Sequence, residues 1–108
     1  MRNAVTALGD PVTANGVVGP THGSSSSVVS IFTVQVVRTA GATDAVDVDL
    51  EGSLDGTTFF KLGDVVTSVA GGTAAGFVVD RPVPFWRYRV VVVGSGNTLR
   101  VHICAMAP

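Results

Sequence analysis

Residues 46–54, with the sequence VDVDLEGSL, decide the fold class of this chain. Apolar residues or glycine occupy every second position, and polar side chains lie between them: Asp47, Asp49, Glu51 and Ser53. Successive side chains of a β-strand point to opposite faces of a sheet. The stretch therefore predicts a half-buried strand with one apolar face and one acidic face.

The rest of the chain continues this pattern. The pair Asp55-Gly56 follows directly and is typical of tight turns. Five further segments are rich in β-branched or aromatic residues and are predicted as strands: 28–38, 58–66, 77–80, 85–93 and 98–106. Turn signals separate them, and no segment has the 3.6-residue period of a helix. The fold class is predicted as all-β, an antiparallel β-sandwich with Greek-key or jelly-roll connections.

Glycine and proline predict where the strands bend. Gly63 predicts a bulge within 58–66, and the Gly- and Ala-rich stretch 70–76 is expected to be a flexible connection. Pro82 and Pro84 predict an edge or a crossover between the two sheets. Packing of the two sheets is expected to bury one set of side chains: Val46, Val48, Leu50, Phe60, Trp86, Tyr88, Val90, Val92, Val101 and Ile103.

Composition limits the classes of partner. A chain of 108 residues makes one domain, and its charged fraction of 14% lies below the roughly 25% usual for soluble domains. With a mean hydropathy of +0.48, we interpret this as a surface covered by copies of the chain or by a partner. A compositional bias toward Val, Ala and Gly is the alternative. The net charge of −1 and the lack of a basic patch argue against nucleic acid. No apolar run approaches the ~20 residues of a membrane helix, so a membrane is not expected either.

Residues 1–27 differ from the rest and are predicted as an extended N-terminal arm before a β-sandwich domain of residues 28–108. Several turn-forming pairs and the GSSSS run interrupt the segment. The arm is expected either to lie along its own sheet or to bind a neighbouring subunit. In the second case, its partner-binding residues are predicted to be Arg2, Val5, Leu8, Val12, Val17, Val18 and His22. A chain without the arm is then expected to fold but to lose its partner.

No pattern in the sequence points to catalysis, and no cofactor is expected. His22, Asp80, His102 and Cys104 could be combined into a hydrolase set, but their spacing matches no catalytic or metal-binding motif. We therefore expect a protein that is not an enzyme.

The acidic row of residues 46–54 has two interpretations. It could bind a hard cation such as Ca²⁺, although alternate strand positions lie about 6.6 Å apart and would need ligands from loops. Arg87 and Arg89 show the same alternate spacing, so the two rows could instead form cross-strand ion pairs on a solvated face. We favour the ion pairs.

The turn and one later strand carry a resemblance to a known group of proteins. The positions that carry it are Glu51, Gly52, Ser53, Asp55, Gly56, Thr57, Phe59, Arg87, Tyr88 and Arg89. The pattern E-G-S-x-D-G-T-x-F followed by R-Y-R-V resembles small β-sandwich proteins of tailed bacteriophage virions. The motif S-x-D-G-x-x-F is also similar to that of discoidin-like, carbohydrate-binding jelly rolls. In physical terms Asp55-Gly56 forms the turn, Ser53 and Thr57 bond its backbone, and an arginine reaches Glu51.

The resemblance implies a virion structural protein. The most specific expectation is a capsid decoration (cement) protein that bridges capsid subunits, with the major capsid protein or another virion protein as partner. It would be made in the bacterial host cytoplasm, would be located in the virion, and would form a homo-oligomer such as a trimer. The alternatives are a tail or baseplate module that binds another virion protein, and a carbohydrate-binding module.

Overall fold

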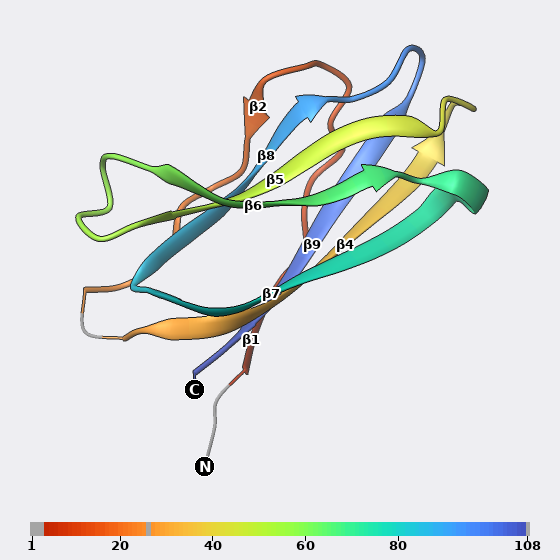
Figure 1. Ribbon diagram of the computed structural model, residues 1–108. Coiled ribbons are helices and arrows are strands. Elements are labelled where there is room, and N and C mark those ends of the chain that lie inside the picture. Colours follow the sequence, from red (N-terminus) through yellow and green to blue (C-terminus); the bar gives the residue numbers. More distant parts are fainter. Residues whose placement is uncertain (1–3, 26, 108) are drawn as a thin grey trace.

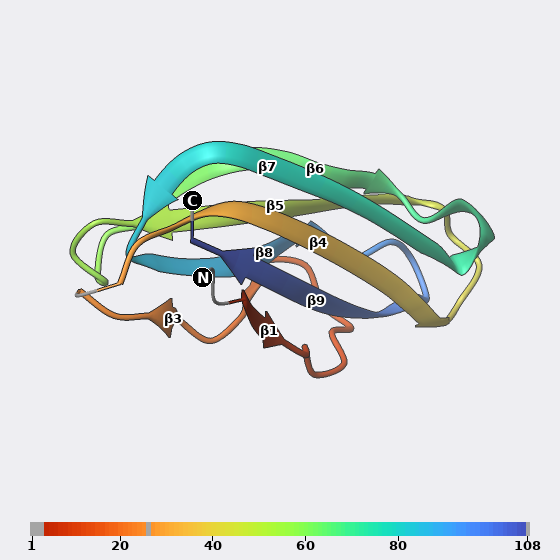
Figure 2. The same cartoon turned by 90° about the horizontal axis from the view of Figure 1, so that it is seen from below.

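The computed structural model describes residues 4–25 and 27–107, which form two antiparallel sheets packed face to face (Figures 1 and 2). The first sheet has the strand order β1 (Ala4–Ala7), β9 (Thr98–Met106), β4 (Val29–Ala40) and β7 (Thr73–Val83). The second has the order β2 (Val17–Val18), β8 (Phe85–Val92), β5 (Ala45–Ser53) and β6 (Phe60–Ser68), and β3 (His22–Gly23) also pairs with β8. The predicted all-β sandwich is confirmed.

The strand that decides the fold class, β5, lies between β8 and β6 in the middle of its sheet. Its inward side chains Val46, Val48 and Leu50 are buried, and they share one core with alternate residues of β4 and β9. Trp86 of β8 is 2% exposed and meets Phe32 of β4 edge-on, with 6.0 Å between the ring centroids. The apolar face of β5 therefore packs as its alternation predicts.

Two residues predicted for the core are exposed instead: Phe60 is 47% and Val92 41% exposed. The register of β8 against β5 shifts between Asp47 and Val48. Next to this shift the alternation of β8 ends, so that Val93 rather than Val92 is buried. Phe60 begins the edge strand β6, opposite Gly52 of β5 and close to the register shift between Leu50 and Glu51. Both errors arise at irregularities that a strict period of two does not contain.

The N-terminal segment lies on its own sandwich, which is the first of the two predicted arrangements. β1 pairs with β9 of the four-stranded sheet, and the chain then crosses over, so that β2 and β3 pair with β8 of the other sheet. Val12 exchanges two backbone hydrogen bonds with Leu99, at 2.7 and 2.9 Å. Figure 2 shows β1 and β3 along one side of the sandwich and β6 and β7 along the other. The segment thus ties the two sheets together on the side away from β6 and β7.

This packing changes what is expected of the residues predicted to bind a partner. Val12 is 3% exposed and belongs to the core, so it is not accessible to a partner. Val5, Leu8 and Val18 remain accessible, while Arg2 lies outside the described residues. Because the segment completes the core, we now expect a chain that lacks it to lose stability as well as any binding function.

The stretch 70–76 is not a flexible connection. It forms a short 3-10 turn, η1 (Ala70–Gly72), and then the start of the long strand β7. Small residues are needed there because β6 approaches β7 closely: a Cβ on Gly76 would lie 2.1 Å from the carbonyl oxygen of Val65. The glycine serves close packing at this position.

The bulge and the crossover predicted from Gly63 and the two prolines are present. The pairing of β5 with β6 shifts register where Gly63 lies opposite Leu50. Pro82 and Pro84 flank the point at which the chain leaves the four-stranded sheet with β7 and enters the other sheet with β8.

Candidate functional site

The turn after β5 has hydrogen bonds that explain its sequence. Gly56 N donates to Ser53 Oγ at 2.9 Å, and Gly56 has a φ of 78°, which favours glycine. Asp55 Oδ1 accepts from Thr58 N at 2.8 Å and from Thr57 N at 2.9 Å. These hydrogen bonds lower the pKa of Asp55 to about 2, and the bond from Thr58 has the largest effect. Ser53 acts as predicted, and the motif builds a structural turn.

Cross-strand ion pairs form on the outer face of the five-stranded sheet, as predicted, but Glu51 and Asp49 are only 7% and 6% exposed, so the expectation of a solvated acidic row is wrong. The strand register places Glu51 opposite Arg87 and Asp49 opposite Arg89. Arg87 Nε donates to Glu51 Oε1 at 2.8 Å, and its guanidinium lies 3.8 Å from the centre of the Phe59 ring. Arg89 also turns to Glu51, at 3.8 Å. Both arginines therefore gather at Glu51.

Three carboxylates gather beside these pairs. One oxygen each from Asp47, Asp49 and Asp64 lies within 4.8 Å of the other two. Burial raises the pKa of Asp49 to about 7, with Asp64 and then Asp47 adding to the shift. Lys61 forms an ion pair with Asp64, and its Nζ is 3.8 Å from Asp49 Oδ2. Two carboxylates of the acidic row, Asp47 and Asp49, converge here, and Glu51 is not part of the group. The third member, Asp64, comes from β6 rather than from a loop, and sequence reasoning missed it.

The outer face of the four-stranded sheet has the opposite character. Pairing of β7, β4 and β9 brings uncharged side chains together in its middle: Ile31, Thr33, Gln35, Ala75, Phe77, Val79, His102, Cys104 and Met106. We call this set the uncharged face. Phe77 is 74% exposed and Val79 is 47% exposed. In the described part of these three strands, charged residues lie toward the ends of the sheet: Arg38 and Arg100 at one end, Asp80 and Arg81 at the other.

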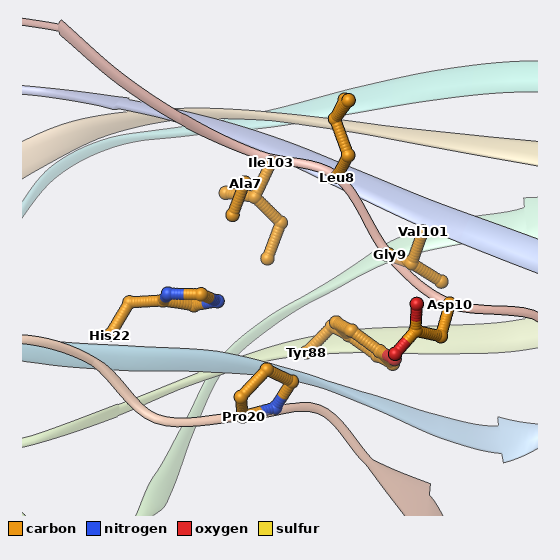
Figure 3. A pocket seen from close by; sticks show the side chains of 9 residues that line it. All are labelled: Ala7, Leu8, Gly9, Asp10, Pro20, His22, Tyr88, Val101 and Ile103. Atoms are coloured by element: carbon orange, nitrogen blue, oxygen red, sulfur yellow. The ribbon is translucent and has the colours of Figure 1, made fainter.

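A small cavity lies between the N-terminal segment and the sheets, with a volume of about 30 Å³ (Figure 3). Asp10 points toward the ring end of Tyr88, and His22 stacks on Trp86 with 4.7 Å between ring centroids. Burial lowers the pKa of His22, whereas burial and then the charge of Asp10 raise the pKa of Tyr88. The volume suits about one water molecule, so the cavity is too small for an organic substrate.

The residues considered for a hydrolase set do not converge. His22 lines the cavity, while His102 and Cys104 lie on the uncharged face. Asp80 lies near the far end of β7 with a φ of 61°.

Val17, another predicted partner-binding residue, packs against the core. The described part of the chain contains no helix that is long and apolar enough to span a membrane.

Comparison with known proteins places the chain in no family. No protein-family model matches it, and no curated protein matches it. Among solved structures, a protein from Bacillus endospore appendages, described as a novel family of disulfide-linked pili, matches with 13% identity and a TM-score of 0.44. The match covers 100% of this chain and 92% of that chain. At this identity and TM-score, the likeness carries no argument about function.

Proposed function

We propose that this protein is a non-enzymatic structural component of a larger protein assembly and that it binds its partner through the uncharged face. The supporting observation is the exposure of Phe77 and Val79 on that face, along the edge strand β7. Covering apolar surface is favourable by about 25 cal/mol per Å², and exposed apolar patches commonly mark interaction surfaces.

The hollow on this face supports the same proposal. It has a volume of about 350 Å³, and Thr33, Gln35, His102 and Cys104 contribute to its lining. Hydroxyl, amide and imidazole groups beside apolar side chains offer a partner both hydrogen bonds and apolar contact. The opposite face carries charged side chains such as Arg89, Lys61 and Asp64, which are about half-exposed. The two faces therefore differ in charge, and the uncharged face is the better candidate for a protein partner.

The specific form that we propose is a capsid decoration protein of a tailed bacteriophage, with the major capsid protein as partner. The resemblance in residues 51–59 and 87–89 and the charged fraction of 14% support this form. A tail or baseplate module would use the same face with another virion protein. Self-association through this face, for example into a trimer, would also cover Phe77.

The test is the paired substitution Phe77→Lys and Leu54→Lys. Both side chains are exposed, at 74% and 70%, so neither change should unfold the domain. Only Phe77 lies on the uncharged face. We expect Phe77→Lys to weaken binding to capsids of the phage that encodes the chain by roughly tenfold or more, because a buried lysine replaces an apolar contact. Leu54→Lys should bind like the unmodified protein in the same co-sedimentation measurement.

Two results would contradict the proposal in different ways. Equal binding by both variants would show that the uncharged face is not the interface. If the unmodified protein binds no capsid and no tail, and mass photometry finds only monomers, the assembly role itself is wrong.

A further inference from the structure

The carboxylates of Asp47, Asp49 and Asp64 gather where the pairing of β5 with β6 is irregular. Alternate residues of one strand are separated by about 6.6 Å, which keeps their side chains apart. Here the pairing of β5 with β6 shifts register between Ala45 and Val48 and again between Val48 and Asp49. The shifts place Asp49 opposite Asp64, and the three carboxylate oxygens lie within 4.8 Å of one another.

The local cations do not balance this charge. Among the described residues, Lys61 is the cation that contacts these carboxylates. It pairs with Asp64, and its Nζ lies 3.8 Å from Asp49 Oδ2. Arg89, which faces Asp49 in the strand register, turns to Glu51 instead. Like charges placed opposite each other in a sheet are unfavourable, so a further positive partner would stabilise the ionised cluster.

Buried oxygens point to that partner. Asp49 is 6% exposed, and its Oδ1 has no hydrogen-bond partner among the residues that the structure describes. The same holds for the buried Oδ1 of Asp47. Asp64 is half-exposed and leaves the cluster open to solvent. Burial of a carboxylate oxygen without a donor is costly, and a metal ion is one of the few partners that satisfies several such oxygens at once.

We propose that Asp47, Asp49 and Asp64 form a binding site for Ca²⁺. Ca²⁺ takes carboxylate oxygens at about 2.4 Å, so oxygens that lie within 4.8 Å of one another can all reach one ion. Mg²⁺ demands near-ideal octahedral geometry and usually keeps several waters, so a cluster of protein carboxylates suits the more adaptable Ca²⁺ better. Water on the open side completes the coordination, and Lys61 moves away from Asp64 when the ion binds.

The site lies on β5 and β6 of the five-stranded sheet, whereas the uncharged face belongs to the four-stranded sheet. It therefore does not depend on the proposed function. With three carboxylates and several waters, the expected dissociation constant is on the order of 10⁻⁴–10⁻³ M, as in weak calcium modules.

The test is calorimetric titration of the full chain with CaCl₂ at pH 8, together with thermal melts in CaCl₂ and in NaCl of equal ionic strength. We expect Ca²⁺ to bind one to one and to raise the melting temperature, whereas NaCl does not. Asp49→Asn and Asp64→Asn should weaken Ca²⁺ binding by roughly tenfold or more, because each removes a charged ligand. Asp64 is half-exposed, so its substitution should leave a folded domain.

Two further variants separate a specific site from general charge attraction. Lys61→Met removes the competing ammonium group and should strengthen Ca²⁺ binding several-fold. Asp44→Asn makes the same charge change at an exposed carboxylate that is paired with Arg38, and it should leave binding unchanged. The proposal is overturned if the unmodified protein neither binds Ca²⁺ in the calorimeter nor melts at a higher temperature in CaCl₂. It is also overturned if Asp49→Asn and Asp64→Asn bind Ca²⁺ as tightly as the unmodified protein. An equal response to Mg²⁺ would overturn the assignment to Ca²⁺.

Discussion

Asp49 and Asp55 lie on one hairpin, yet their pKa values move in opposite directions. Asp55 accepts hydrogen bonds from two backbone amides in an exposed turn, and these lower its pKa to about 2. Asp49 loses contact with water and faces Asp64, and burial as the main cause raises its pKa to about 7. The same side chain thus keeps its charge and stabilises a turn at one position, whereas at the other position burial makes it harder to ionise.

Substitution of Asp55 by alanine tests the turn. A folded-state pKa of about 2, below the ordinary 3.8, means that the carboxylate stabilises the fold above pH 3.8 and that this contribution is lost as the pH falls toward 2. Asp55→Ala should lower the melting temperature by a few degrees at pH 7, and the difference should shrink between pH 4 and pH 2. Circular-dichroism melts at these three values measure it.

The uncharged Leu54→Ala, in the same turn, is the control, because its effect should not change with pH. A loss in Asp55→Ala that stays constant down to pH 2 would show that the carboxylate charge plays no part.

The sequence predicts residue contacts wherever spacing alone decides them. Ser53 bonds the turn backbone, and Arg87 reaches Glu51 from the alternate position of a neighbouring strand. The approach of Asp64 to Asp49 could not be predicted in the same way. It depends on where the register of β5 and β6 shifts, and each shift by one residue moves a side chain to the other face.

At the scale of elements, the N-terminal segment shows where composition misleads. Glycine and proline predict irregular backbone, and the segment is irregular for much of its length. Several of its glycines, however, are required by contact with the sandwich: a Cβ on Gly9 would lie 2.1 Å from the carbonyl oxygen of Val101. Gly9 N also donates to His102 Nδ1 at 3.1 Å. A residue type that signals flexibility in an isolated peptide here permits tight docking.

Gly9→Ala should therefore loosen this segment. The new methyl group meets backbone that cannot yield, and overpacking of this kind costs about 1–3 kcal/mol. Gly63→Ala is the matched control, because a Cβ there meets only Val78 Cγ2 at 3.5 Å, an ordinary contact. Urea denaturation gives both free energies of unfolding. Equal values for the two variants would mean that the docking of the segment adds nothing to stability.

The long strand β7 is a second case in which tertiary contact overrides a local signal. Its Gly- and Ala-rich beginning predicts a loop, since these residues have low strand propensity. Its neighbour β4 supplies a continuous ladder from Val37 opposite Thr73 to Ile31 opposite Val79, and the pairing resumes after a register shift with Val29 opposite Val83. Pairing with a long partner strand therefore extends β7 over residues that would not form a strand alone.

For the whole molecule, the small number of charged residues does not say on which surface they lie. The charged fraction of 14% predicts that some surface is covered, but a composition is a sum over all surfaces and assigns no charge to a face. The strand register makes that assignment: one sheet carries Glu51 with its arginines, and the other carries Phe77. The sequence predicts only the face that carries Glu51, because the acidic residues of one strand and the arginines of another have the same alternate spacing.

The pairing of β1 with β9 has a consequence for how the chain can be rearranged. Ala4 lies opposite Met106, and Figure 1 shows both strands reaching the same end of the sandwich. Paired residues of antiparallel strands are only about 5 Å apart, so a short Gly/Ser linker can join them. New ends can be opened in the exposed turn at Gly71 and Gly72.

We expect this circular permutant to fold, with the circular-dichroism spectrum and cooperative melting of the original chain, since such cuts are tolerated in exposed turns. A permutant opened inside β5, between Val48 and Asp49, should not fold, because it cuts the central strand of its sheet. If the first permutant is unfolded, the connection at η1 is essential for assembly of the sandwich. If it folds, β1 and β9, which are far apart in this sequence, can be made consecutive, and two fused proteins can be displayed from the turn at η1 instead of from the end where β1 and β9 meet.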